Sequence, residues 1–358
     1  MDARFELQTL GMEGLLQFQA LQTDAVNAVS ERFYQAHGAS YARFGPRGRN
    51  ACREDLTFHL EFLRPVLEFG VLQPMVDYLV WLSEVLSARG IPNAHVSLSL
   101  EWLAEFFSER MCAEDGAVVA QALKAAETNF RPATQGVASP APLTEPWPEM
   151  AKFQSALLAG RQHEAWTILN RCLDDGHNLV DLELHLIQPS LYQIGKKWQA
   201  NKVTVAQEHM ATAIVQSVMT LGLLRTQPPP MNGKRVLLAC VEGNSHAIGL
   251  RMVSDGFQLA GWDVQFLGAN MPSAALVGQV VEWRPDLVGL SVSFPQQLRV
   301  VKDVIARLDK HFGGARPAVI IGGLAINRFS QLADAVGADG HSPNAPAAVA
   351  YANQSLAS

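Results

Sequence analysis

Five apolar, strand-like runs alternate with helical stretches in the last third of the chain, and this alternation restricts the fold more than any other feature. The strand-like runs lie at 235–241, 263–267, 286–292, 318–321 and, more weakly, 337–341. The helical stretches lie at 246–259, 273–283, 296–312, 325–336 and 345–354. Apolar strands that alternate with helices are typical of a parallel sheet covered on both faces. The pattern predicts a flavodoxin-like, doubly wound domain with five strands.

The rest of the chain predicts helices. Apolar residues recur at helical spacing over 15–34, 56–69, 76–86 and 98–111, and again over 149–158, 163–175, 179–198 and 205–224. The second group predicts a four-helix bundle, in which Pro189 interrupts the third helix and Thr204 caps the fourth. Five prolines make 131–148 an extended linker. The predicted domains are therefore an all-helical domain at 1–130, the linker, the bundle at 149–228 and the α/β domain at 229–358.

Composition excludes several classes of protein. Of 358 residues, 48% are hydrophobic and 17% charged, which indicates a folded protein with more than one core. The net charge of -6, without a basic stripe, argues against direct contact with nucleic acid. Four isolated cysteines argue against zinc and disulfide frameworks. Neither a secretory signal nor a membrane-spanning run is recognisable, so we expect a cytoplasmic protein with no membrane partner.

Small and polar residues follow four of the predicted strands. His246 stands in the stretch 244–249 after the first strand, and a Gly-Ala-Asn-Met-Pro stretch, 268–272, follows the second. Ser291 and Ser293 follow the third strand, and Gly322 and Gly323 follow the fourth. Because the carboxyl ends of parallel strands meet at one edge of the sheet, these residues should line a slot there. A deep slot suits the long tail of a ligand better than a compact phosphate.

These residues resemble the Asp-x-His-x-x-Gly, Ser and Gly-Gly motifs of the cobalamin-binding domain of methionine synthase, methylmalonyl mutase and their relatives, over about residues 234–356. The resemblance implies that His246 binds cobalt from below. It implies that the nucleotide tail enters the slot lined by Ser291, Ser293, Gly322 and Gly323. Gly249 matches the motif, but Asn244 replaces its aspartate, and Glu242 is a second candidate partner for the imidazole. The alternative is a surface histidine that caps a helix.

A second motif lies in the predicted bundle. Nine residues separate Trp198 from the pair Glu208 and His209, and this Trp-x9-Glu-His pattern resembles that of light-sensing cobalamin repressors. The resemblance implies that Trp198 packs on an adenosyl group and that Glu208 hydrogen-bonds to it. It also implies that His209 becomes the upper cobalt ligand after light. The alternatives are an ordinary core position for Trp198 and a carboxylate at a helix N-terminus for Glu208.

The first 130 residues resemble the globin-like module of photocobilins, photoreceptors that join cobalamin to a bilin, over 33–65 and 77–86. The resemblance implies a biliverdin, whose propionates and pyrrole nitrogens need cationic and polar partners. The candidate partners are Arg49, Arg53, His59, Tyr78, Trp81 and His95. Cys52 is either a thioether link to the bilin or inert. The alternatives for this domain are haem with His59 or His95 as axial ligand, or a helical core without a cofactor.

Together these features predict a light sensor and not an enzyme. Adenosylcobalamin would be held between the bundle and the α/β domain, and biliverdin would be the second chromophore. Light would change the upper ligand of cobalt and the self-association of a homo-oligomer, which would signal to a downstream protein that the sequence does not identify. The alternatives are a corrinoid carrier for methyl transfer and a cobalamin-responsive antirepressor of transcription.

Overall fold

The computed structural model describes residues 7–133, 145–227 and 229–356. The chain divides into two compact units, Met1–Ser139 and Pro140–Ser358. Most of the predicted linker lies outside the described residues.

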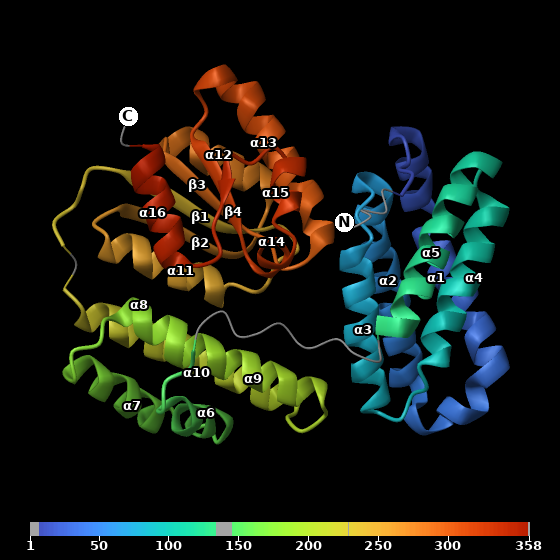
Figure 1. Cartoon of the computed structure of the whole chain (residues 1–358), viewed down its shortest axis with the longest axis horizontal. Coiled ribbons are helices and arrows are strands. Elements are labelled where there is room, and N and C mark those ends of the chain that lie inside the picture. Colours follow the sequence, from blue (N-terminus) through green and yellow to red (C-terminus); the bar gives the residue numbers. More distant parts are fainter. Residues whose placement is uncertain (1–6, 134–144, 228, 357–358) are drawn as a thin grey trace. The chain divides into compact units, whose positions relative to one another are not determined.

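The described part of the first unit is built from five α-helices (Figure 1). The four that the sequence predicts are confirmed, and a fifth, α5, was not predicted. Its buried face consists mainly of small and aliphatic residues, including Val119 and Ala126, so its apolar pattern is weak. The predicted domain boundary at residue 130 falls inside this helix. The helices are α1 (Met12–Tyr41), α2 (Gly45–Phe69), α3 (Gln73–Ser87), α4 (Ala94–Arg110) and α5 (Ala113–Ala133).

The second unit begins with the helical bundle. Its helices are α6 (Met150–Leu158), α7 (Gln162–Asp174), α8 (Leu179–Leu182), α9 (Gln188–Gln199) and α10 (Val205–Arg225). A five-residue π-turn, Glu183–Ile187, joins α8 to α9, so the two form one interrupted helix and the four-helix prediction is confirmed. Pro189 has no N–H for the carbonyl of His185, which instead accepts from the Trp147 N–H at 3.1 Å.

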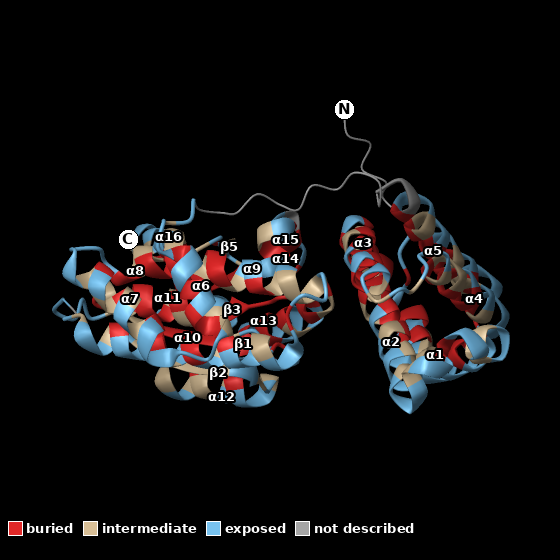
Figure 2. Ribbon diagram, turned by 90° about the horizontal axis from the view of Figure 1, so that it is seen from below, coloured by how far each residue is buried: buried red, intermediate tan, exposed pale blue. Residues whose placement is uncertain are grey.

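The sheet that follows has five parallel strands in the order β2-β1-β3-β4-β5. This is the flavodoxin-like order, and the predicted fold is confirmed. The three central strands β1, β3 and β4 are almost wholly buried, as their apolar runs required, whereas the edge strand β2 is only partly buried (Figure 2). The strands are β1 (Arg235–Val241), β2 (Asp263–Met271), β3 (Leu287–Ser291), β4 (Ala318–Gly322) and β5 (Gly340–His341).

Helices cover both faces of the sheet. The pair α11 and α16 packs on one face, and α12 and α13 pack together on the other (Figure 1). The bundle lies against α11, whose Met252 is buried in the bundle core. One helix therefore belongs to both halves of the second unit. The remaining helices are α11 (Ile248–Leu259), α12 (Ser273–Trp283), α13 (Leu298–Phe312), α14 (Leu324–Arg328), α15 (Gln331–Ala335) and α16 (Ala345–Ser355).

Three local predictions were wrong. Gly268 and Asn270 were expected in a turn, but strand β2 continues through them. Both residues adopt positive φ, and the pairing of β2 with β1 shifts register there. The helix expected over 325–336 is two helices, separated where Phe329 has the extended φ of -135°. The fifth strand pairs over two residues only.

Candidate functional site

Side-chain hydrogen bonds to backbone groups hold the turn that follows β1. Asn244 is fully buried, and its amide donates to the Ser291 carbonyl at 2.8 Å. The Asn244 Oδ1 accepts from the His246 backbone N–H at 3.1 Å, which closes an Asx-type turn. The asparagine therefore fixes the backbone that presents His246, and it uses its N–H donors on β3, which a carboxylate in its place could not do.

His246 stands at the mouth of the sheet with its imidazole exposed. The ring meets Phe294 edge-on, with centroids 5.3 Å apart. Desolvation lowers the pKa of His246, and the Glu208 carboxylate opposes that shift. A neutral imidazole is the form that ligates metals. Among the described residues no side chain hydrogen-bonds to its ring nitrogens, so the lone pair is available.

Glu242 is not the partner of the imidazole, contrary to one expectation. Its Oε2 accepts from the N–H and the hydroxyl of Ser273, both at 3.2 Å, at the start of α12. A carboxylate at a helix N-terminus is stabilised there by the unpaired N–H groups. Glu242 therefore anchors α12 to the turn.

Gln297 is a residue of the site that sequence reasoning missed. Its Nε2 donates to the Gly243 carbonyl at 2.9 Å, and its Oε1 accepts from the N–H groups of Ser293 and Phe294 at 2.9 and 3.1 Å. It thus ties the His246 turn to the segment after β3. No local motif marks this role, because the two segments are more than 50 residues apart in sequence.

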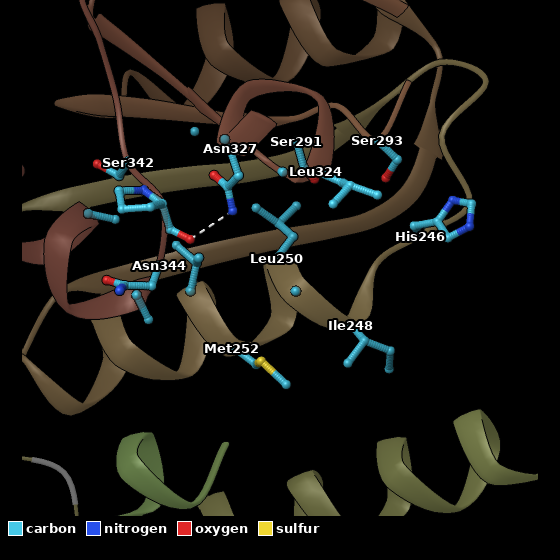
Figure 3. A pocket seen from close by; sticks show the side chains of 18 of the residues that line it. His246, Ile248, Leu250, Met252, Ser291, Ser293, Leu324, Asn327, Ser342 and Asn344 are labelled. Atoms are coloured by element: carbon cyan, nitrogen blue, oxygen red, sulfur yellow. Dashed lines mark hydrogen bonds between the residues drawn. The ribbon is translucent and has the colours of Figure 1, made fainter. Parts of the chain in front are cut away.

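A cavity of about 250 Å³ opens beside His246 and runs along the carboxyl ends of β1, β3 and β4 (Figure 3). The predicted residues Gly249, Ser291, Ser293, Gly322 and Gly323 all line it. Small residues are needed here, because a Cβ on Gly323 would lie 2.4 Å from the Val292 carbonyl oxygen.

Several lining residues were not predicted. Asn327 donates to the Pro343 carbonyl at 3.0 Å, but its buried Oδ1 and the hydroxyl of Ser342 have no partner among the residues that the structure describes. Buried polar atoms without partners carry a cost that a bound ligand can remove. The slot is therefore mostly apolar, with two polar atoms available to a ligand. The bundle contributes Leu184, Gln188, Leu191 and Tyr192 to the same cavity.

The bundle residues predicted to lie above the cofactor are on α9 and the start of α10. The predicted cap is confirmed: Thr204 and Gln207 form a capping box that fixes the first turn of α10. The Glu208 Oε2 lies 2.6 Å from His209 Nδ1, and its Oε1 accepts from Thr212 at 3.1 Å. Trp198 is half-buried against the bundle core. Glu208 and His209 lie in the first turns of α10, which packs on α11, the helix that follows His246.

In the first unit, the structure brings His59, Tyr78 and Trp81 together. His59 is buried, and its ring nitrogens lie 2.9 Å from the Tyr78 hydroxyl and 3.2 Å from that of Ser99. Both nitrogens are thus engaged, which leaves none for a haem iron. Burial lowers the pKa of His59 to about 4, so the ring is neutral. Trp81 is exposed beside Tyr78, with ring centroids 6.3 Å apart.

The other candidates of this unit gather around Tyr34 and Tyr41. The Arg49 guanidinium lies 4.6 Å from the centre of the Tyr34 ring, and His95 hydrogen-bonds to the Tyr41 hydroxyl through Nδ1. Arg53 is exposed. Burial raises the pKa of Cys52 to about 11, so its thiol stays protonated and weakly nucleophilic.

Asp55 is a further group of this unit that the sequence did not single out. Burial, with the charge of Glu54, raises its pKa to about 7. Its charge also acts on Tyr78, so it lies near the His59 group.

Comparison with known proteins bears on the second unit. Residues 234–350 and residues 150–221 each match a family described as a B12 binding domain. The chain is 31% identical to the HTH-type transcriptional repressor CarA of Myxococcus xanthus, over 48% of this chain and 57% of the repressor. It is 29% identical to dimethylamine corrinoid protein 3 of Methanosarcina mazei, over 46% of this chain and 99% of that protein. The chain thus spans little more than half the length of the repressor.

The fold also has a solved counterpart. The structure of the monomethylamine corrinoid protein of Methanosarcina barkeri superposes on 57% of this chain with a TM-score of 0.50 and 19% identity. The superposition includes 97% of that protein. This likeness supports the fold of the second unit. Within the described residues, no helix is long and apolar enough to cross a membrane.

Proposed function

We propose that the protein is a light sensor whose chromophore is adenosylcobalamin, held between the bundle and the α/β half of the second unit. The observation that carries the proposal is the contact of Glu208 with His209 on α10, a bundle helix that packs on α11, the helix that follows His246. A methyl-carrying site needs no ionisable pair above the cofactor. A switch needs residues that contact it differently in two states.

Different residues of this chain would hold different parts of the cofactor. His246 would be the lower ligand, and Asn244 and Gln297 would hold its turn in place. The slot lined by Ser291, Ser293, Gly322 and Gly323 would take the nucleotide tail, with Asn327 and Ser342 supplying polar partners. When bound, adenosylcobalamin supplies a cobalt–carbon bond that light cleaves.

The bundle residues above the cofactor would produce the response to light. In the dark, Trp198 would pack on the adenosyl group and Glu208 would accept a hydrogen bond from it. After light, His209 would leave Glu208 and occupy the upper position, which would displace α10 relative to α11. The output would be a change in homo-oligomer assembly that a downstream protein detects, and the protein would catalyse no reaction of its own.

Illumination of the adenosylcobalamin-loaded protein tests this proposal. We expect the absorption spectrum to change and the oligomer to change size in gel filtration with light scattering. An unchanged spectrum together with an unchanged mass would refute it. The methylcobalamin-loaded protein is the matched control for the role of the adenosyl group.

We also propose that the first unit holds a biliverdin beside Tyr78, Trp81 and His95. The support is the group of aromatic side chains with Arg49 nearby and with Asp55, a carboxyl able to face pyrrole nitrogens. Because both His59 nitrogens are engaged, His95 is the one of the two predicted axial ligands that stays open to haem, the alternative cofactor. Co-expression with a biliverdin source should give a red absorption band, and its absence would remove the second chromophore.

A corrinoid carrier for methyl transfer is the second candidate function. The alignment with a dimethylamine corrinoid protein favours it, since 99% of that protein has a counterpart in this chain. A carrier should bind methylcobalamin at least as tightly as adenosylcobalamin and should tolerate Trp198→Ala. The sensor should lose adenosylcobalamin selectivity in that variant. A cobalamin-responsive antirepressor would instead bind a transcription factor with no need of light.

A further inference from the structure

Two buried carboxyl groups meet where the bundle packs on the α/β half. Glu183 lies in the π-turn of the bundle and Asp255 lies on α11, and the side chains of both are inaccessible to solvent. Each carboxyl acts electrostatically on the other, and a hydrogen bond can join them when one of them carries a proton. Neither residue lines the cofactor slot, although Leu184 and Val253 near them do.

When both carboxyl groups of this pair are ionised, some of their oxygens lack a hydrogen-bond donor. Among the described residues, neither oxygen of Glu183 meets an N–H or O–H donor, and neither does Oδ2 of Asp255. The other oxygen of Asp255 accepts from Arg251 Nε at 2.7 Å. Three buried acceptors without a donor would be costly, and a proton on one carboxyl turns it into a donor to the other.

The charges point to the same arrangement. One arginine faces two carboxyls, so a single proton makes the group of three neutral. Burial and the negative charge of Asp255 raise the pKa of Glu183 well above its usual range, and Arg251 opposes this only in part. Burial raises the pKa of Asp255 too, but Arg251 and Glu183 favour its charged form. Arg251 and Asp255, both on α11, are the charged groups that act on Glu183.

We propose that Glu183 and Asp255 share one proton and that this proton-mediated contact fastens the bundle to α11. The contact exists only while the proton is present. Its loss would leave two negative charges and one positive charge in a buried interface, which is unfavourable. The contact between the bundle and α11 therefore weakens as pH rises. It acts on the helix that follows His246, whatever cofactor is bound.

The direction of the pH effect follows from linkage. Below the ordinary carboxyl pKa, the folded and the unfolded chain both carry the proton. As pH rises, the unfolded chain releases it first, so stability falls until the folded chain releases it as well. Thermal unfolding of the full chain from about pH 5 to pH 8 should thus show a falling Tm.

The Glu183→Gln variant isolates the contribution of the shared proton to stability. Its amide is neutral, has the same shape and donates to Asp255 at every pH. Relative to wild type, its Tm should rise by several degrees at the alkaline end, and the difference in slope should correspond to about one proton. Subtracting the two curves removes other titrating groups such as Asp55. Glu164→Gln, an exposed carboxyl on α7, is the control and should follow wild type. Parallel curves for Glu183→Gln and wild type would overturn the proposal.

Infrared spectroscopy tests the proton directly, even if Glu183→Gln does not fold. At neutral pH the wild type should show the carbonyl stretch of a buried carboxylic acid. Asp55→Asn removes the other carboxyl with a strongly raised pKa outside this pair, so the band that remains should come from the Glu183–Asp255 pair. A spectrum of Asp55→Asn without that band would also overturn the proposal.

Discussion

Single residues at the edge of the sheet have distinct roles, and two glycines show the contrast. Gly323 has a φ of +97°, and a Cβ there would meet the Val292 carbonyl oxygen at 2.4 Å. Gly323→Ala should therefore destabilise the second unit by roughly 1–3 kcal/mol, measured as a lower Tm or denaturant midpoint. Gly249 has open space around the same position.

Gly249→Ala is the matched control for that substitution. It should leave stability unchanged or slightly higher, because alanine favours the helix that Gly249 occupies. Since Gly249 lines the slot, its new methyl group should instead weaken cobalamin binding in a titration. Equal stability losses in the two variants would contradict this division of roles.

His209 should matter to the light response and hardly at all to folding. Its contact with Glu208 is largely exposed, with 74% of the His209 side chain accessible, and such exposed side-chain contacts contribute little to stability. His209→Ala should keep its Tm and bind adenosylcobalamin in the dark. After light it should lack the spectrum of a cobalamin with two imidazole ligands. His163→Ala, an exposed histidine on α7, should behave as wild type. A normal light-state spectrum in His209→Ala would exclude the ligand role.

At the scale of helices and strands, the capping box of α10 links stability to the site. Thr204→Ala removes the hydrogen bond to the Gln207 N–H and should cost about 1 kcal/mol, which is roughly 2–4 °C in Tm. The frayed turn carries Glu208 and His209, so the light response should slow as well. Thr220→Ala, at an exposed position nearer the C-terminal end of the same helix, is the control and should be close to neutral. A Thr204→Ala protein as stable as the control would show that the cap is dispensable.

The strand–helix alternation was sufficient to predict the sheet, because buried parallel strands have a strong and regular apolar signal. The limits of β1 and α12 agree with the prediction to the residue. The helix α5 was missed because its buried face is built largely from small residues, whose pattern is weak. The continuation of β2 through Gly268 was missed because a bulge depends on pairing with β1, which no local pattern encodes.

The site was predictable where a short motif carries it and not where long-range contacts do. His246 and the paired glycines follow strands, so topology alone places them at one edge. Gln297 and Ser342 enter the site only through tertiary contacts with distant segments. Glu183 was equally invisible, because a glutamate in a helix indicates an exposed position until its neighbours are known.

For the whole molecule, the division into two compact units predicts two separable activities. Each unit has its own buried core, as Figure 2 shows, so each should fold when expressed alone. Residues 140–358 should bind adenosylcobalamin with the affinity of the full chain and respond to blue or green light. Residues 1–139 should carry any red band from biliverdin.

Calorimetry provides the quantitative measurement. If the units are independent, the unfolding trace of the full chain should equal the sum of the traces of the two fragments. Adenosylcobalamin should shift only the transition of the second unit, since a ligand stabilises the part that binds it. Thr204→Ala should shift the same transition and leave the other in place. A single transition in the full chain that neither fragment reproduces would show instead that the units stabilise each other, and a light signal could then pass from one to the other through that shared stability.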